Sequence, residues 1–243
     1  MLHSSLPTTD ITVNNIIGSG LLAKSFLSHS NVLSNVCIYA AGVSNSNCVD
    51  AFEFERERVR LTETLKSYSN VDSFVYFSTC SIADVASQHS AYVLHKLAME
   101  NLIARHPNFI IVRLSQVAGN TPNPHTLLNY LYAKISRSEK FSIWKNAIRN
   151  IIDIDDVTLI VIQLIKDSKF RRVILNVANP ISYSIVTIVA IMEKVIGKTA
   201  IADVINKNSS YEIDTTQISE IITKMGLSFD NEYILRVIQK YYG

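Results

Sequence analysis

The sequence is poor in cysteine and lacks the common metal-ligand spacings. Its three cysteines, Cys37, Cys48 and Cys80, are odd in number and form no CxxC pair. This argues against a disulfide framework and favours reduced thiols, so we expect a cytoplasmic protein. The six histidines are scattered and contain no HExxH or similar spacing. We therefore expect no metal site.

Long apolar runs and a marked excess of one charge are also absent. The most apolar segments, such as residues 157–165 (VTLIVIQLI), are too short to cross a bilayer. Residues 1–13 show no basic segment followed by an apolar one, so we expect no signal peptide. The net charge of +2, from 23 basic and 21 acidic residues, is not the footprint of a nucleic-acid-binding protein. We therefore expect neither a membrane nor a nucleic acid as partner.

No proline- or glycine-rich linker, internal repeat or low-complexity segment divides the chain. Its 243 residues are 48% hydrophobic and 18% charged, a composition typical of an ordered protein with a sizeable core. Predicted strands alternate with predicted helices throughout. This pattern favours an α/β fold, with a doubly wound parallel sheet and helices on both faces. We expect one compact unit over 1–243 with a small C-terminal lobe.

A glycine turn lies between the first predicted strand (11–17) and the helix after it. The stretch GSGLLA places Gly18, Gly20 and Ala23 in a GxGxxA pattern. In a dinucleotide site the first glycine allows a tight turn, the second lets a pyrophosphate approach the backbone, and the small third residue lets helix and strand pack closely. Such a turn can also join strand and helix without binding anything. The acidic residue expected about 20 residues later, for the ribose hydroxyls, is absent.

Two tyrosine–lysine pairs have the spacing that puts both side chains on one helix face. They are Tyr92 with Lys96 and Tyr130 with Lys134. A free phenol titrates near pH 10. A cation in the same pocket lowers that pKa and makes the phenol an acid–base group usable near neutral pH. The spacing alone does not separate such a pair from an ordinary amphipathic helix.

The segment 50–68 (DAFEFERERVRLTETLKSY) predicts a long helix of mixed charge. We expect Phe52, Val59 and Leu65 to mark its buried side and most of its charged residues to form a solvated face.

In their order, these elements resemble the extended short-chain dehydrogenase/reductase family of sugar-nucleotide epimerases, dehydratases and reductases. The resemblance covers nearly the whole chain. It is carried by the following stretches: IIGSGLLAKSF (16–26), VCIYAAGVS (36–44), FVYFSTCSIAD (74–84), YVLHK (92–96), VRLSQVAG (112–119), IRNIIDIDDV (148–157), ILNVANP (174–180), SIVTIVAIMEKVIGK (184–198) and YEIDTTQISEIITKMGLSF (211–229). It implies a Rossmann-like fold with a nucleotide-binding core mainly over 10–145. The substrate lobe would lie mainly over 120–150 and 178–243.

The resemblance also assigns the reaction site. It favours Tyr92/Lys96 over Tyr130/Lys134, because Tyr92 shortly follows the strand that carries Ser78 and Thr79. Thr79, Tyr92 and Lys96 would be the catalytic residues, with Lys96 also holding the nicotinamide ribose. The implied cofactor is NAD or NADP, bound by Gly18, Gly20, Leu21, Leu22, Ala40, Ala41, Gly42, Tyr92 and Lys96.

The resemblance implies a nucleotide-sugar substrate, with Ser78, Cys80, Gln116 and Arg149 as contacts. Arg149 matches the family's phosphate-clamping arginine, a task suited to a guanidinium fork. Dehydratases of the family carry Asp-Glu directly after the catalytic threonine, whereas Cys80 and Ser81 stand here. Reduction or epimerisation is therefore favoured over dehydration.

The sequence departs from the family between the first helix and the strand at 36–41, where the second and third βαβ steps are missing or reduced to a remnant. We therefore predict a smaller sheet in which the strand 11–17 lies next to the strand 36–41, with no further strands between Phe26 and Val36. The resemblance further implies a homodimer formed by the helices near 50–67 and 90–105.

Two functions from different classes remain open. One is a nicotinamide-dependent reductase or epimerase, which the intact set of Thr79, Tyr92 and Lys96 favours. The other is a degenerate relative that binds or senses a ligand without turnover, which the missing adenosine-side segment favours. A nucleic-acid-binding role is remote, because the charge is near neutral.

Overall fold

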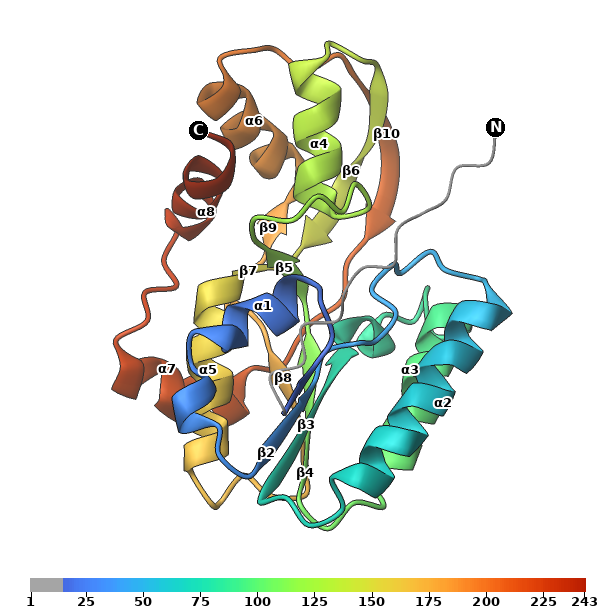
Figure 1. Ribbon diagram of the computed structural model, residues 1–243. Helices are drawn as coiled ribbons and strands as arrows, with labels where there is room; N and C mark the ends of the chain where they lie inside the picture. The colour runs from blue at the N-terminus through green and yellow to red at the C-terminus, as the bar shows by residue number, and fades with distance from the viewer. Residues whose placement is uncertain (1–14) are drawn as a thin grey trace, which may run out of the picture.

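The computed structural model describes residues 15–243, and in it five parallel strands form the main sheet, in the order β1-β2-β3-β4-β8 (Figure 1). The strands are β1 (Ile16–Ile17), β2 (Val36–Tyr39), β3 (Ser73–Thr79), β4 (Phe109–Leu114) and β8 (Val173–Val177). Positions 11–14 of the first predicted strand lie outside the described residues. The predicted Rossmann-like parallel sheet is confirmed.

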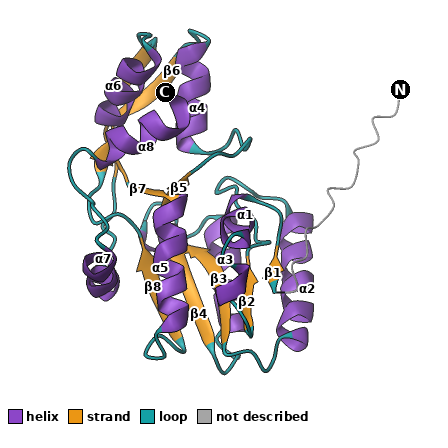
Figure 2. Cartoon of the chain, turned by 60° about the vertical axis from the view of Figure 1, so that its left-hand side comes forward, coloured by secondary structure: helices purple, strands orange, loops and turns teal. Residues whose placement is uncertain are grey.

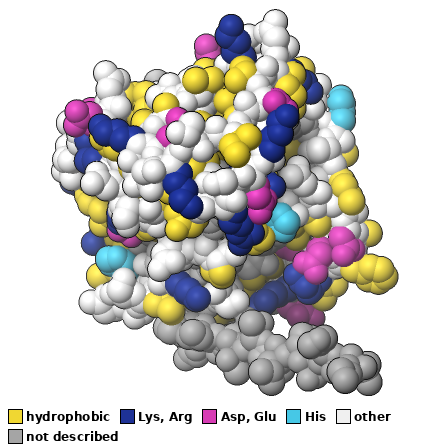
Figure 3. Space-filling model, turned by 90° about the horizontal axis from the view of Figure 1, so that it is seen from above, with side chains coloured by type: hydrophobic (Ala, Val, Ile, Leu, Met, Phe, Trp, Pro, Cys, Tyr) yellow, Lys and Arg dark blue, Asp and Glu magenta, His cyan; other side chains and the backbone are white. Residues whose placement is uncertain are grey.

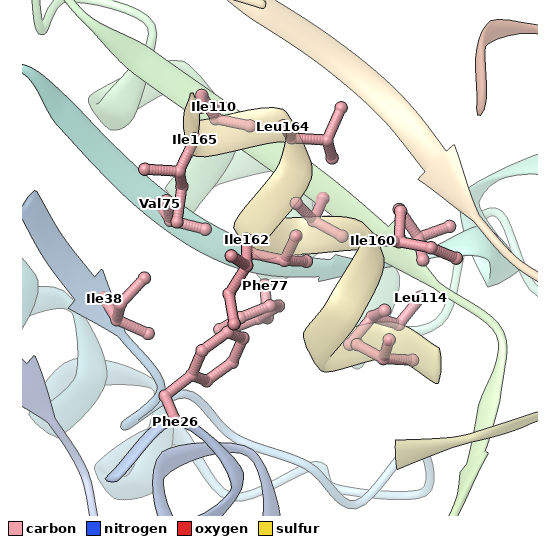
Figure 4. Close-up of a cluster of buried hydrophobic side chains, with 14 of the residues drawn as sticks. Phe26, Ile38, Val75, Phe77, Ile110, Leu114, Ile160, Ile162, Leu164 and Ile165 are labelled. Carbon is pink, nitrogen blue, oxygen red and sulfur yellow. The ribbon is translucent and has the colours of Figure 1, made fainter. Parts of the chain in front are cut away.

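Helices cover both faces of this sheet. α1 (Leu21–Leu27) and α5 (Ile154–Lys166) pack on one face, and α2 (Ala51–Ser67) and α3 (Ala91–Ile103) pack on the other (Figure 1). β3 is buried at every position, as expected for a strand covered on both sides. On the α5 face, Phe26 of α1 stacks on Phe77 of β3 at 5.8 Å between ring centroids (Figure 4).

The link between β1 and β2 is as short as the sequence predicts. It contains α1 and the short 3-10 turn η1 (Ser30–Val32), and no strand of the described chain lies between them. Ile16 pairs with Ile38, and Ile17 pairs with Tyr39. β1 is therefore the edge strand of the sheet, directly beside β2.

The buried side of α2 differs from the prediction. Phe52 is 87% exposed and Val59 is 41% exposed, and Leu65 is only partly buried. The buried residues of this helix are instead Glu57, Leu61 and Thr64. The prediction that Phe52 and Val59 mark the buried face is wrong, because α2 turns a different face inward, on which Glu57 is buried beside Leu61 and Thr64.

A second group of elements lies beyond the carboxyl ends of the main strands and has a hydrophobic cluster of its own (Figure 2). Its helices and strands are β5 (Gln116–Ala118), α4 (Leu127–Ser136), β6 (Phe141–Arg149), β7 (Ile151–Asp153), β9 (Tyr183–Ser184), α6 (Ile185–Ile196), β10 (Ala202–Ser209) and α8 (Tyr233–Tyr242). β6 pairs in parallel with β10 and antiparallel with β9, while β5 pairs with β7. The division into a nucleotide-binding core and a substrate lobe remains a prediction.

None of the helices in residues 15–243 combines the length and the hydropathy that a bilayer crossing needs. Seen from above, lysine and arginine side chains are dispersed among hydrophobic and acidic ones and do not gather into a single stripe on that face (Figure 3).

Candidate active site

A cavity of about 730 Å³ opens at the carboxyl ends of the main strands. This is where parallel α/β sheets bind their ligands, and the volume lies in the range of small-molecule sites, about 300–1,000 Å³. Its walls come from the glycine turn, the end of β2, the ends of β3 and β4, and α3: residues 18–22, 39–44, 77–79, 114–119, Tyr92 and Lys96. The predicted catalytic residues and glycine turn thus share one cavity.

Tyr92 lies in the first turn of α3. The helix begins after Ser90, whose hydroxyl accepts a hydrogen bond from the backbone of Val93 at 3.3 Å. Tyr92 is 7% exposed, and Thr79 at the end of β3 is equally buried. Burial raises the pKa of Tyr92 to about 12, against an opposing hydrogen bond with the Thr79 side chain. Thr79 and Tyr92 are therefore placed together, and Tyr92 is a protonated phenol at neutral pH.

Lys96 lies one turn further along α3, and its Nζ stands 5.9 Å from the centroid of the Tyr92 ring. Its Nζ donates to Tyr76 Oη at 3.1 Å, to Glu57 Oε1 at 3.3 Å and to the Phe77 carbonyl at 3.5 Å. Burial lowers the pKa of Lys96, and Glu57 opposes that shift. The net shift of the Tyr92 pKa is upward, because burial of the phenol dominates, so the lowering expected from a nearby cation stays a prediction.

Glu57 also lines the cavity and was not predicted from the sequence. Its side chain is 1% exposed. Oε1 accepts from Tyr76 Oη at 2.7 Å and from Lys96, and Oε2 accepts from His95 Nε2 at 2.9 Å and from the Val43 backbone at 2.6 Å. Burial would raise the pKa of Glu57, but these hydrogen bonds and the Lys96 charge hold it at about 2. In the sequence, Glu57 stands four residues before Leu61, so the two side chains share one face of α2, and this face packs inward.

The glycine turn fits a ligand that approaches the backbone. Gly18 has φ +134°, and a β-carbon there would stand 2.5 Å from the Ala40 carbonyl oxygen, so only glycine fits. A β-carbon on Gly20 would meet nothing within 4 Å, so this backbone is open to the cavity. Leu21, Leu22, Ala40, Ala41 and Gly42 line the same cavity.

Two buried hydroxyls in the cavity wall have no partner among the described residues. They are Ser78 Oγ, at the end of β3, and Ser115 Oγ, just after β4. Buried polar atoms are normally hydrogen-bonded, so a polar ligand group in the cavity would satisfy them. Together with the open Gly20 backbone, they make the site compatible with a nicotinamide dinucleotide.

The predicted substrate contacts divide into two pairs. Ser78 and Gln116 line the cavity, whereas Cys80 and Arg149 do not. Cys80 Sγ donates to the Arg113 carbonyl at 3.2 Å, and burial raises its pKa to about 12. Arg149 Nη1 donates to the Ser209 carbonyl at 3.0 Å and to its hydroxyl at 3.1 Å.

Two tyrosines of the C-terminal part, Tyr211 and Tyr242, also line the cavity and were not predicted. Burial raises the pKa of Tyr211, and a hydrogen bond with the Ser81 side chain opposes the shift. Tyr242 Oη donates to Asn129 Oδ1 at 2.6 Å. Because both lie far along the chain from the strand ends, no local pattern points to them.

The second tyrosine–lysine pair lies outside the cavity. Lys134 Nζ donates to Glu139 Oε2 at 2.7 Å, and the Tyr130 ring packs edge-on against Phe141 at 6.1 Å. Neither Tyr130 nor Lys134 lines the cavity. Within the described part of the chain, no group of three or more His, Cys, Asp or Glu side chains could hold a metal ion.

Sequence comparison points to one family. The profile of the NAD dependent epimerase/dehydratase family matches residues 29–178, more than half of the chain. No curated protein matches the sequence.

Solved structures share the fold at low identity. WbmH from Bordetella bronchiseptica, in complex with NAD⁺, is 15% identical with a TM-score of 0.69, over 90% of this chain and 78% of that one. UDP-glucuronic acid 4-epimerase from Bacillus cereus, in complex with UDP-glucuronic acid and NAD, is 20% identical with a TM-score of 0.68, over 85% and 74%. RMD from Pseudomonas aeruginosa, complexed with NADPH, is 14% identical with a TM-score of 0.65, over 86% and 81%. At these identities the likeness shows the fold alone.

Proposed function

The chain belongs to the NAD-dependent epimerase/dehydratase family, and on that basis we propose that it is an oxidoreductase that reduces the keto group of a nucleotide-linked sugar. The proposal rests on one observation: Thr79, Tyr92 and Lys96 line the same cavity as the glycine turn. Because the family is NAD-dependent, the cofactor is a nicotinamide dinucleotide, NAD or NADP.

The residues of the site fit the two halves of a ketone reduction. A bound reduced nicotinamide would supply the hydride to the carbonyl carbon. Tyr92 donates its phenolic proton to the carbonyl oxygen, and the Thr79 hydroxyl holds the same oxygen by a hydrogen bond. After the alcohol leaves, Tyr92 regains a proton from water. Lys96, whose Nζ lies close to Gly42 in the cavity wall, would hold the cofactor ribose.

Epimerisation of the same class of substrate is the alternative reaction, in which Tyr92 would first accept and then return the proton. Cys80 and Ser81, in place of an acidic pair, leave no acid–base pair there for dehydration.

A ligand-binding module without turnover is the second candidate, and one observation favours it. β1 is the edge strand, so within the described chain no further strand lies beside it to contact the adenosine half of a dinucleotide. Because these contacts are missing, we expect weak cofactor affinity.

A homodimer is part of the proposal. Phe52 and Val59 lie seven residues apart on one side of α2, and Leu94 on α3 is 52% exposed. α2 packs against α3, so these apolar residues support an isologous contact between two copies. We also propose a cytoplasmic location, supported by the three free cysteines.

Direct titration tests the function. NADH and NADPH fluorescence is followed during addition of protein, and the reduced cofactor is then mixed with a panel of 4-keto nucleotide sugars. Binding with cofactor oxidation supports the reductase. Binding of a nucleotide sugar without oxidation of either cofactor supports the binding module instead.

A further inference from the structure

We propose that Arg56 and Arg60 of α2 bind the 2′-phosphate on the adenosine ribose of the cofactor, so that the protein uses NADPH in preference to NADH. The proposal rests on the proposed function and goes beyond it, because it chooses between the two nicotinamide dinucleotides. Both arginines line the cavity, and the sequence analysis predicted neither as a site residue.

The two arginines lie on the side of the cavity next to the open edge of the main sheet. They stand four residues apart on α2, so their side chains share one helix face. Both face Tyr39, the last residue of β2, because their charges oppose the rise that burial causes in the pKa of this phenol. β2 pairs with the edge strand β1, which leads into the glycine turn.

A dinucleotide that spans this cavity would bring its adenosine half towards these arginines. Thr79 and Tyr92, at the end of β3 and the start of α3, mark the reacting end, where the nicotinamide would lie. The pyrophosphate would lie at the glycine turn. The adenosine half would then continue towards the edge of the sheet, where Arg56 and Arg60 line the wall.

The charges in the cavity wall fit a phosphate better than a ribose hydroxyl. Dinucleotide sites for NAD hold the 2′-hydroxyl with an Asp or Glu, whereas sites for NADP place an arginine near the 2′-phosphate. Among the described residues that line the cavity, Glu57 is the only carboxylate. Its oxygens already accept from four donors within the protein: Tyr76, Lys96, His95 and the Val43 backbone. This wall therefore favours the cofactor that carries the additional phosphate.

Arg56 holds an ion pair that a phosphate can replace. Its guanidinium binds the carboxylate of Glu53, with Nη1 2.7 Å from Oε1, and its side chain is 70% exposed. Exposed ion pairs of this kind contribute little to stability. A guanidinium binds a phosphate through two parallel, charge-assisted hydrogen bonds. Glu53 is thus the acidic group that would oppose phosphate binding here.

Arg58 provides a matched control on the same helix. It pairs with Glu55, three residues earlier, as Arg56 pairs with Glu53. Unlike Arg56, however, Arg58 does not line the cavity. Arg58→Ala therefore removes a similar charge and a similar ion pair from α2 without changing the proposed phosphate site.

Binding is measured by fluorescence titration with NADPH and NADH, and by calorimetry with adenosine 2′,5′-bisphosphate and 5′-AMP, which differ only in the 2′-phosphate. Wild type should bind NADPH about tenfold or more tightly than NADH, and the bisphosphate more tightly than 5′-AMP. Arg56→Ala and Arg60→Ala should each weaken NADPH binding by about tenfold and change NADH binding far less. Arg58→Ala should bind both cofactors as wild type does. Glu53→Gln should strengthen NADPH binding about two- to fivefold, because it removes the opposing charge.

Equal affinity for the two cofactors, or a preference for NADH, would overturn the proposal. So would an equal loss of both affinities in Arg56→Ala and Arg60→Ala, since this would assign the arginines to the pyrophosphate that both cofactors share. If neither cofactor binds, this proposal and the proposed function are both wrong. A protein that prefers NADPH through these arginines but reduces no keto sugar would contradict the proposed function alone. Keto-sugar reduction with equal affinity for NADH would contradict the arginine proposal alone.

Discussion

Gly42 lies so close to Lys96 that a β-carbon at position 42 would stand 2.7 Å from Nζ of the lysine, and 2.9 Å from Oε1 of Glu57. The Gly42→Ala change should therefore push the Lys96–Glu57 pair apart. Overpacking of this kind costs about 1–3 kcal/mol. We expect a loss of that size in the free energy of urea unfolding, together with weaker NADPH binding. Wild-type stability and affinity in Gly42→Ala would contradict this geometry.

Gly20 provides the matched contrast. A β-carbon there meets nothing within 4 Å, and Gly20 has φ −80°, which alanine adopts freely. Gly20→Ala should therefore leave the unfolding free energy within about 0.5 kcal/mol of wild type. Cofactor affinity should nevertheless fall by about tenfold or more, because the methyl group would block the approach of a pyrophosphate. Unchanged NADH and NADPH affinity would show that the turn does not bind the cofactor.

The stability of the protein should depend on Glu57 at acid pH. The folded-state pKa of Glu57 is lowered from 4.5 to about 2, so the native state holds the ionised form. The stabilisation is present above the unfolded pKa and is lost as pH falls from about 4.5 towards about 2. The unfolding free energy of wild type minus that of Glu57→Gln should shrink across this window. A difference that stays constant would contradict the lowered pKa.

Phe52 should control association. It is 87% exposed on α2, and Phe52→Glu would place a charge in the proposed dimer contact. We expect a dimer for wild type and a monomer for Phe52→Glu in sedimentation equilibrium. Val186→Glu is the control, because Val186 is 43% exposed on α6, away from this contact. If the wild type is a monomer at high protein concentration, the proposed dimer is wrong.

Much of the fold follows from sequence patterns that act locally. Buried strands such as β3 read as short apolar runs, and helix starts are marked by Ser90 and Asp153, each of which caps its helix. The place of Tyr92 and Thr79 follows from the order of these elements. The direct passage from α1 to β2 likewise predicts that β1 lies next to β2.

The missed features depend on contacts between segments far apart in the chain. Glu57 sits in a run of alternating charges, which reads as a solvated face until α3 is known to place His95 and Lys96 beside it. Arg149 has the right position in its motif, but Ser209, 60 residues later, takes up its guanidinium. Such pairings have no periodicity and follow only from the assembled fold.

The rate of keto-sugar reduction by Tyr92→Phe tests the central claim most directly. The phenylalanine ring keeps the packing and removes the proton donor, so we expect a loss of about 10²–10⁴-fold in kcat at unchanged stability. Tyr130→Phe is the control, since Tyr130 packs on Phe141 outside the cavity, and it should keep wild-type activity. A Tyr92→Phe protein that reduces the sugar as fast as wild type and Tyr130→Phe would contradict the account.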